Sequence, residues 1–285
     1  MCIERLDKWS PIDEFARKQY LMATSRCVRA VNASCNLEMD CVDACAVAAD
    51  FLVTASTEHF VGCFVPEHDC VDQNVHRRAG PGLRRECAQR FHELRRFNNK
   101  TPSMTATSAG SGGLATRVMS SVFARVPQPP PPIRVLVTSG QCLPAASIVH
   151  VVAPHCSHNP SRWNKDIKNC YTLALLRALA EAKSDAAITV VLPLLCTGLH
   201  QCVLYGVHAC AAAALHAVTS LCLRYRRLSV LFAVSAKTMS MHQDAFYSCC
   251  IDLADKPSHT PLRDQLLQFA LKVRHVGRVD EGPAA

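Results

Sequence analysis

The sequence lacks an apolar leader, and one long stretch of it lacks charge. Its first 15 residues carry charged side chains throughout and contain no apolar run of the kind that marks a signal peptide. This absence argues against export, so we expect an intracellular protein of the cytoplasm or nucleus. Its 17 cysteines are then expected to be reduced thiols that act mostly as small buried hydrophobes, with a disulfide framework as the alternative.

No Asp, Glu, Lys or Arg occurs from Ala186 to Leu223, a stretch long enough to cross a membrane. Pro193 and Gly198 interrupt it, and His208 and His216 would be costly in lipid. Its first part, AAITVVLPLL, has the continuous β-branched character of a strand buried on both faces, and its second part places apolar residues at helical spacing. We therefore predict a strand, a loop and a buried helix, and no membrane partner.

Charge is distributed unevenly along the rest of the chain. The formal net charge is +8, and the segment from His76 to Lys100 alone has eight Lys or Arg residues against two Glu, a net of +6. Apolar residues at helical spacing mark a buried stripe in this segment, so its arginines lie mostly on the outer face. A solvated helix face is one interpretation. The other is a site for a polyanion, either RNA or DNA or poly(ADP-ribose), on the helices between Arg77 and Arg96.

Strand and helix patterns alternate along the chain, which indicates an α/β fold with a largely parallel sheet. With 49% hydrophobic residues among 285, the chain can bury a substantial core. Residues 98–132 contain SAGSGG and PQPPPP with little periodic apolar pattern, which predicts a flexible insertion. We predict strands at 27–31, 49–54, 133–138, 147–152, 186–195 and 228–235, and helices at 10–22, 71–78, 83–96, 165–182, 207–222 and 260–273.

Four segments, in the correct order, resemble motifs of the macro domain family. VDQNVHRRAGP at 71–81 and LPAASIVHVVAP at 143–154 are similar to a helix and a strand of that family, and LPLLCTGL at 192–199 is similar to its second binding loop. DFLVTAST at 50–57 stands where the family has DAIVNAAN. The resemblance implies a divergent macro domain, a three-layer α/β/α sandwich with a mixed, largely parallel sheet. It would span residues 26–252, with a helical extension at 1–25 and a C-terminal helix and tail at 253–285.

The resemblance also implies a ligand, which is ADP-ribose or a mono- or poly-ADP-ribosylated protein, and it implies no cofactor. In this family two backbone loops clasp the diphosphate and the neighbouring ribose. The resemblance places Asp43 against the adenine amino group and Thr57 where the family has a ribose-binding Asn. The corresponding loop residues are Val71 and Asp72 in the first loop and Cys196, Thr197, Gly198, Leu199 and His200 in the second.

Several residues depart from the family pattern. Because Thr57 replaces the Asn that supports hydrolysis in active members, we expect binding rather than catalysis. The glycine run that lets backbone approach phosphate is replaced by His68, Asp69 and Cys70, and the Asp69 carboxylate would repel a diphosphate. In the second loop, His200 stands where another aromatic residue is usual. The sequence therefore supports only about half of the contacts that the two loops of this family make with the diphosphate.

Clusters of His and Cys offer a competing chemistry, because these residue types bind zinc. The spacing matches no standard zinc finger, and chance clusters are expected in a chain with 17 Cys and 13 His, so no metal site is predicted. A nucleophilic Cys70 paired with His200 is a further alternative. The two candidate zinc groups are His59, Cys63, His68 and Cys70, and Cys196, His200 and Cys202.

Three functions follow, in order of preference. The first is recognition of ADP-ribose or ADP-ribosylated protein. The second is a macro fold that serves as an interaction surface for protein or nucleic acid through the arginine-rich helix. The third is ADP-ribosyl hydrolysis. The first requires that the loops at 57–71 and 196–202 face one another at one rim of the sheet.

Overall fold

The structure is a computed structural model. It describes residues 36–65, 70–100, 134–154, 159–182, 187–197, 206–225 and 228–276. The predicted helix at 10–22, the predicted strand at 27–31, most of the insertion predicted at 98–132 and the tail after residue 276 lie outside these ranges. Residues 98–100, predicted to begin the insertion, instead end a helix.

Six strands form one mixed sheet in the order β1-β6-β5-β2-β4-β3. Neighbouring strands are parallel except β3 and β4, which are antiparallel, so the predicted largely parallel sheet is confirmed. The strands are β1 (Asn36–Asp40), β2 (Phe51–Ser56), β3 (Val135–Ser139), β4 (Ser147–Val152), β5 (Ile188–Val191) and β6 (Leu228–Ala233).

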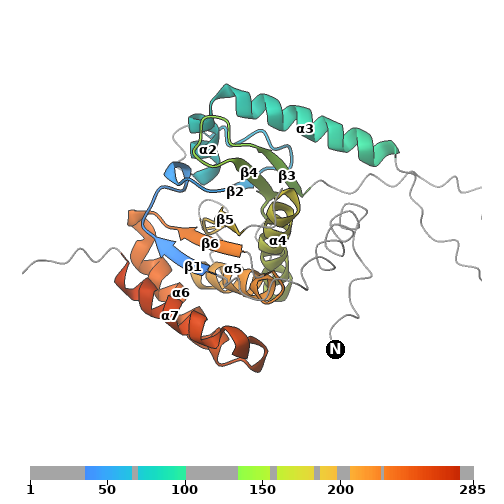
Figure 1. Cartoon of the computed structure of the whole chain (residues 1–285). Coiled ribbons are helices and arrows are strands. Elements are labelled where there is room, and N and C mark those ends of the chain that lie inside the picture. Colours follow the sequence, from blue (N-terminus) through green and yellow to red (C-terminus); the bar gives the residue numbers. More distant parts are fainter. Residues whose placement is uncertain are drawn as a thin grey trace, which may run out of the picture.

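Helices cover both faces of the sheet, which confirms the three-layer sandwich (Figure 1). One face carries α2 (Val71–Ala79) and α3 (Pro81–Lys100), together with the short 3-10 helix η2 (Ala44–Ala46). The other face packs against a larger set of helices. These are α4 (Pro160–Glu181), α5 (Gly206–Cys222), α6 (Met239–Ala254) and α7 (Arg263–His275).

Strand β2 shows why the sheet is buried on both sides. Its first four residues are all buried, as expected for a central parallel strand. Because side chains alternate along a strand, Phe51 and Val53 join the core under α4–α7, whereas Leu52 joins the core under α2 and α3. The sheet thus separates two hydrophobic cores.

Most predicted elements are present. The strands predicted at 49–54, 133–138, 147–152 and 228–235 correspond to β2, β3, β4 and β6, and the stretch at 186–195 contains β5. Helices predicted at 71–78, 83–96, 165–182 and 207–222 correspond to α2, α3, α4 and α5. Helix α4 begins earlier than predicted, because Asn159 caps it by accepting the N–H of Arg162 and Pro160 occupies its first turn.

One strand and one α-helix of the described part were not predicted. Strand β1 has only two buried residues, Leu37 and Met39, so its apolar signal is short. Helix α6 begins without a side-chain hydrogen bond at its cap, Thr238, which removes the usual signal for a helix start. Its buried residues Phe246, Cys250 and Leu253 nevertheless lie on one face.

The C-terminal helix predicted at 260–273 corresponds to α7, preceded by the 3-10 helix η5 (Pro257–Leu262). Phe269 and Val273 of α7 are buried in the core under α4–α7. None of the helices in the described ranges has the length and apolarity needed to cross a membrane. Eleven of the described cysteines are free thiols, as expected, but Cys222 takes part in a disulfide.

Candidate functional site

The carboxyl ends of the parallel strands meet at one edge of the sheet. Strands β2 and β5 are neighbours, with Leu52 opposite Val191, so the chain leaves both strands at this edge. The loop after β2 leads to α2, and the loop after β5 leads to α5. In open α/β sheets, ligands bind just outside the carboxyl ends of the strands. The starts of the two predicted binding loops are therefore side by side.

The first loop is held by side chains from α2 and α3. Gly62 has a φ of 82°, and a Cβ at this position would lie 2.6 Å from Cδ2 of His76, so only glycine fits without displacing that ring. Arg84 donates a hydrogen bond to the carbonyl of Val61. Further along the loop, Gln73 Nε2 donates to the carbonyl of Val65 at 3.0 Å. These contacts fix the backbone of residues 61–65.

Two predicted residues of the first loop lie at the start of α2. Val71 is half-buried, and Cys70 caps the helix by accepting the backbone N–H of Gln73 at its Sγ, at 3.3 Å. Asp72 is buried, and this burial raises the pKa of its carboxyl to about 7, against a hydrogen bond from the backbone of Cys63 that lowers it. The buried Asp72 side chain thus stabilises the first loop through its contact with the backbone of Cys63. Thr57, by contrast, is exposed at the carboxyl end of β2.

The second loop turns sharply at Cys196, which has a φ of 61° although it is not glycine. The hydroxyl of Tyr171 accepts the backbone N–H of Leu195 at 2.7 Å, and Thr197 Oγ1 donates to the carbonyl of Leu194 at 2.9 Å. Residues held in this left-handed conformation are concentrated at functional sites. Burial raises the pKa of the Cys196 thiol to about 12. Gly198, Leu199 and His200 lie outside the described residues.

Asp43 lies on the connection between β1 and β2, which passes over the face covered by α2. Its carboxylate accepts the backbone N–H of Cys45 at 2.9 Å and pairs with Arg78 of α2. A second acid was missed by the sequence analysis. Asp40 is the last residue of β1, it is exposed, and it therefore lies at the carboxyl edge of the sheet. An acidic residue at the end of a strand would have indicated Asp40, but the strand β1 was not predicted.

Comparison with known proteins finds the same arrangement in solved macrodomains. A family model described as "Macro domain" matches residues 125–211. A solved Oceanobacillus iheyensis macrodomain with ADP is 23% identical, has a TM-score of 0.53, and aligns over 78% of this chain and 95% of its own. The form of that protein with MES bound has a TM-score of 0.54 at 22% identity, over 78% of this chain and 96% of its own. This chain has the macro domain fold.

Two curated relatives match part of this chain. A Staphylococcus aureus "Protein-ADP-ribose hydrolase" is 27% identical over 128 residues, which are 44% of this chain and 36% of the relative. A Fusarium oxysporum f. sp. cubense protein named "Probable bifunctional ADP-ribose hydrolase/ADP-ribosyltransferase" is 28% identical over 137 residues, which are 47% of this chain and 17% of the relative. The matches therefore span about a third or less of each relative's length.

The first candidate metal group, which was considered but not predicted as a site, is only partly brought together. Cys63 and Cys70 interact with one another, and burial is the main cause that raises the pKa of Cys70 to about 11. His59 is exposed and packs edge-on against Phe91, with 6.1 Å between the ring centroids. His68 lies outside the described residues, as do His200 and Cys202 of the second group. The predicted Cys70–His200 pair cannot be placed for the same reason.

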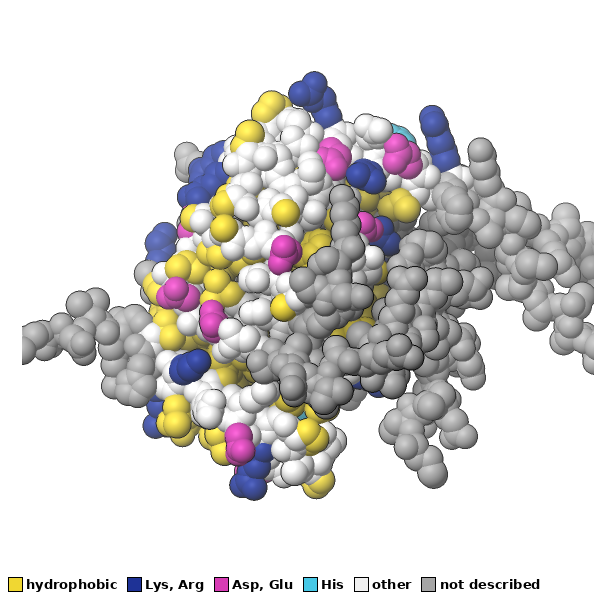
Figure 2. Space-filling model, in the orientation of Figure 1, with side chains coloured by type: hydrophobic (Ala, Val, Ile, Leu, Met, Phe, Trp, Pro, Cys, Tyr) yellow, Lys and Arg dark blue, Asp and Glu magenta, His cyan; other side chains and the backbone are white. Residues whose placement is uncertain are grey.

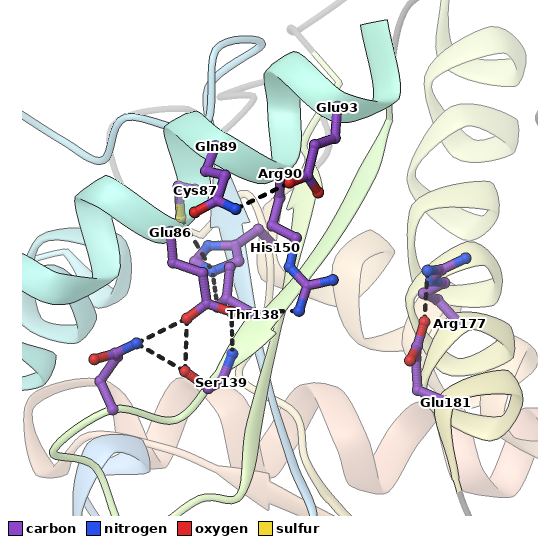
Figure 3. Close-up of polar contacts among 11 residues, drawn as sticks. Glu86, Cys87, Gln89, Arg90, Glu93, Thr138, Ser139, His150, Arg177 and Glu181 are labelled. Atoms are coloured by element: carbon purple, nitrogen blue, oxygen red, sulfur yellow. Dashed lines mark hydrogen bonds and ion pairs between the residues drawn. The ribbon is translucent and has the colours of Figure 1, made fainter. Parts of the chain in front are cut away.

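A different group of ligand-type side chains is buried between α2, α3 and β4. Potential ligand atoms of His76, Cys87 and His150 all lie within 4.8 Å of one another. His150 Nε2 is 2.9 Å from Thr138 Oγ1 and 3.7 Å from Cys87 Sγ (Figure 3). Burial lowers the pKa of His76 to about 4 and that of His150 to about 3, so both imidazoles are neutral at pH 7. This group was not predicted, because its members are far apart in the chain.

Proposed function

We propose that this macro domain binds ADP-ribose, free or attached to protein, at the carboxyl edge of its sheet. The observation that carries the proposal is the adjacency of β2 and β5, which starts both predicted loops at one rim. The first loop leads into the N-terminus of α2, and the second turns at Cys196 in a left-handed conformation. Free backbone N–H groups in such turns and helix starts are suited to a diphosphate.

The remaining contacts follow from the residues around this rim. The exposed hydroxyl of Thr57 can bond a ribose hydroxyl as donor or acceptor. The adenine amino group needs an acceptor, and Asp40 and Asp43 are the two candidates. Asp43 already accepts from Cys45 and Arg78, whereas Asp40 accepts only the backbone N–H of Cys41, at 2.7 Å, among described partners. Asp40 therefore has more free acceptor capacity for the base.

Calorimetry with ADP-ribose tests the proposal. We expect binding by the full chain and a loss of about tenfold in affinity for Thr57→Ala and for one of Asp40→Ala and Asp43→Ala, as for loss of a hydrogen bond to a bound ligand. Asp264→Ala, at an exposed site on α7, is the matched control and should bind as the wild type does. Absence of heat and of any thermal shift at millimolar ADP-ribose would contradict the proposal.

ADP-ribosyl hydrolysis is the second candidate, and the interaction between Cys63 and Cys70 in the first loop favours it. With His68 between them in the sequence, these are three residues of zinc-ligand type within eight positions of the first loop. A zinc ion bound there would activate water beside the ribose, a role that Thr57 does not supply. The curated relatives named as hydrolases support the same candidate.

Metal analysis of the purified chain, combined with release of ADP-ribose from a modified protein, tests this candidate. We expect about one zinc per chain, with loss of both metal and activity in Cys63→Ser and Cys70→Ser. Cys142→Ser, at an exposed thiol, should change neither. If Cys87→Ser removes the metal instead, the buried group of His76, Cys87 and His150 holds it. Metal-free protein that releases ADP-ribose at the full rate would rule out a role for zinc.

A further inference from the structure

Four basic side chains meet between α4, α5 and η5, and none of them belongs to the two predicted loops. Lys168 comes from α4 and His216 from α5, whereas Lys256 and His259 come from the start of η5 and from η5 itself. We name these four residues the basic cluster. His259 is buried, Lys168 and His216 are half-buried, and Lys256 is exposed. The basic cluster therefore reaches solvent through Lys256, while its other members are held by the fold.

Hydrogen bonds link Lys168 of the basic cluster to α5. Lys168 Nζ lies 3.2 Å from His216 Nε2, and His216 Nδ1 lies 3.0 Å from Ser220 Oγ. Because a Lys ammonium has only donors, His216 Nε2 accepts, and the neutral ring therefore carries its proton on Nδ1 and donates to Ser220. The His259 ring packs edge-on against His216, with 5.7 Å between the ring centroids. In this arrangement His216 can gain a second proton, on Nε2, only if the Lys168 ammonium turns to another acceptor.

The charges around the basic cluster are positive. Burial and the charge of Lys256 lower the pKa of Lys168. Burial also lowers the pKa values of His216 and His259, and the two neighbouring lysines lower both of them further. Among the residues that the structure describes, no carboxylate forms an ion pair with Lys168 or Lys256. The members of the basic cluster thus repel one another without an acid between them.

This repulsion indicates what the basic cluster lacks. The acid nearest to Lys168 along α4 is Asp166, which pairs instead with Arg162 at 3.8 Å. Half-buried positive charges that face one another cost free energy, because each disfavours the charged form of the others. A bound anion would remove this cost. Lys ammonium groups are point charges with three donors each, which suits the several oxygens of a phosphate or sulfate group.

We propose that the basic cluster binds a tetrahedral oxyanion, a phosphate or sulfate group, between Lys168 and Lys256. The oxygens of the anion accept from both ammonium groups. Because the Lys168 ammonium can then turn to the anion, His216 becomes free to take a proton on Nε2, and the positive rings of His216 and His259 strengthen binding as the pH falls. The proposal is independent of ADP-ribose binding, since its residues lie outside both predicted loops.

The test follows the imidazole signals of the full chain by NMR while sodium sulfate is added. Sulfate keeps its charge across the range in which histidine titrates, so a pH dependence of binding belongs to the protein. Sodium chloride at equal ionic strength is the reference for general screening. Inorganic phosphate and phenyl phosphate, added in the same way, distinguish a site for the free ion from a site for a phosphate ester.

Two variants remove one charge each from the basic cluster, Lys168→Met and Lys256→Met. The second keeps the test valid if the first does not fold, because the exposed Lys256 side chain makes no hydrogen bond or ion pair with the described residues. Figure 2 shows other Lys and Arg side chains on the lower part of the molecule, where α7 lies in Figure 1, so a matched control for charge is needed. Lys272→Met, at an exposed position on α7, is that control.

We expect sulfate to shift the signals of His216 and His259 and to raise the pKa of both rings. The affinity should therefore increase about tenfold between about pH 7.5 and about pH 5.5. Lys168→Met and Lys256→Met should each lose about tenfold or more, as for a lost hydrogen bond to a charged group, whereas Lys272→Met should bind as the wild type does. Calorimetry with ADP-ribose should give the same result for Lys256→Met as for the wild type, whatever that result is.

Three outcomes would overturn the inference. One is that sulfate moves the signals of His216 and His259 no further than chloride does. Another is that Lys256→Met binds sulfate as tightly as the wild type. The last is an equal loss in Lys272→Met, which would mean that net charge alone attracts the anion. None of these outcomes bears on the proposed function, which the calorimetry with ADP-ribose tests separately.

Discussion

The two faces of the sheet are packed in different ways. Under α4–α7 the core is apolar and aromatic, with Phe232, Phe246 and Phe269 in mutual contact at centroid distances of 4.6 to 6.1 Å. Under α2 and α3 the core is smaller and contains buried polar side chains, among them His76 and His150. Within the described part, neither ring nitrogen of His76 nor Nδ1 of His150 has a hydrogen-bond partner.

The two faces therefore contribute differently: one mainly to stability, the other to the proposed binding site. Burying polar groups without partners costs free energy, and proteins tolerate that cost mainly at functional sites. The polar side is the one whose helices hold the first loop, through His76 against Gly62 and Arg84 on Val61. The side under α4–α7 also buries polar atoms without a hydrogen-bond partner in the described part, such as His242 Nε2, but it supplies most of the hydrophobic burial. Substitutions on the two sides should therefore change the free energy of unfolding by different amounts and with different dependence on pH.

The largest effect is expected on the apolar side. Phe269→Ala removes a buried ring that packs against Phe232 and Phe246, and should lower the free energy of unfolding by about 3–5 kcal/mol. Leu271→Ala, at a residue of the same helix that is 60% exposed, should change it by less than about 0.5 kcal/mol. Urea unfolding measures both. A loss below about 1 kcal/mol for Phe269→Ala would show that α7 adds little to this core.

The sequence predicts the central strands and most of the helices on the two faces, but not all of their elements. Continuous apolar runs identify the central strands, because a strand buried on both faces needs no polar residue. The helices α2 to α5 have caps or clear apolar stripes. Strand β1 and helix α6 lack these signals, since β1 is exposed on alternate residues and α6 has no side-chain cap. Their positions depend on tertiary packing, which a local pattern does not contain.

The candidate site was harder to predict than the fold. Local motifs indicate both loops, and the adjacency of β2 and β5 bears out the idea that they start at one rim. The role of an individual residue depends on whether its side chain is buried, and a local sequence pattern does not show this. Asp72 has the right motif position but its side chain is buried. The group of His76, Cys87 and His150 unites residues from α2, α3 and β4, so only the fold brings them together.

The polar side should also make stability depend on pH. Burial lowers the pKa of His150 to about 3, whereas an unfolded histidine has a pKa near 6.5. Between these values the unfolded chain binds more protons than the folded one, so stability is lost as the pH falls below about 6.5. His150→Gln should reduce the slope of unfolding free energy against pH by about 1.4 kcal/mol per pH unit between pH 6 and pH 4. Urea unfolding at several pH values measures it, and equal slopes would contradict a neutral buried imidazole.

A more direct test, with smaller expected effects on stability, replaces one buried threonine on each face. Thr138 on β3 and Thr219 on α5 are both buried, and Thr→Val preserves the volume of either side chain. Thr138 Oγ1 is the nearest hydrogen-bond partner of His150 Nε2, at 2.9 Å, whereas Thr219 bonds the carbonyl of Leu215 within its own helix, at 2.8 Å.

Thr138→Val should lower the free energy of unfolding by about 1–3 kcal/mol, because it leaves a buried imidazole nitrogen with only the weak contact to Cys87. Thr219→Val should cost less than about 1 kcal/mol, because the carbonyl of Leu215 also accepts within the helix. Urea unfolding of the two variants under identical conditions gives the difference. If Thr219→Val costs as much as Thr138→Val, the polar core under α2 and α3 is no more dependent on its hydrogen bonds than the apolar one, and the division of the molecule into a stable face and a binding face fails.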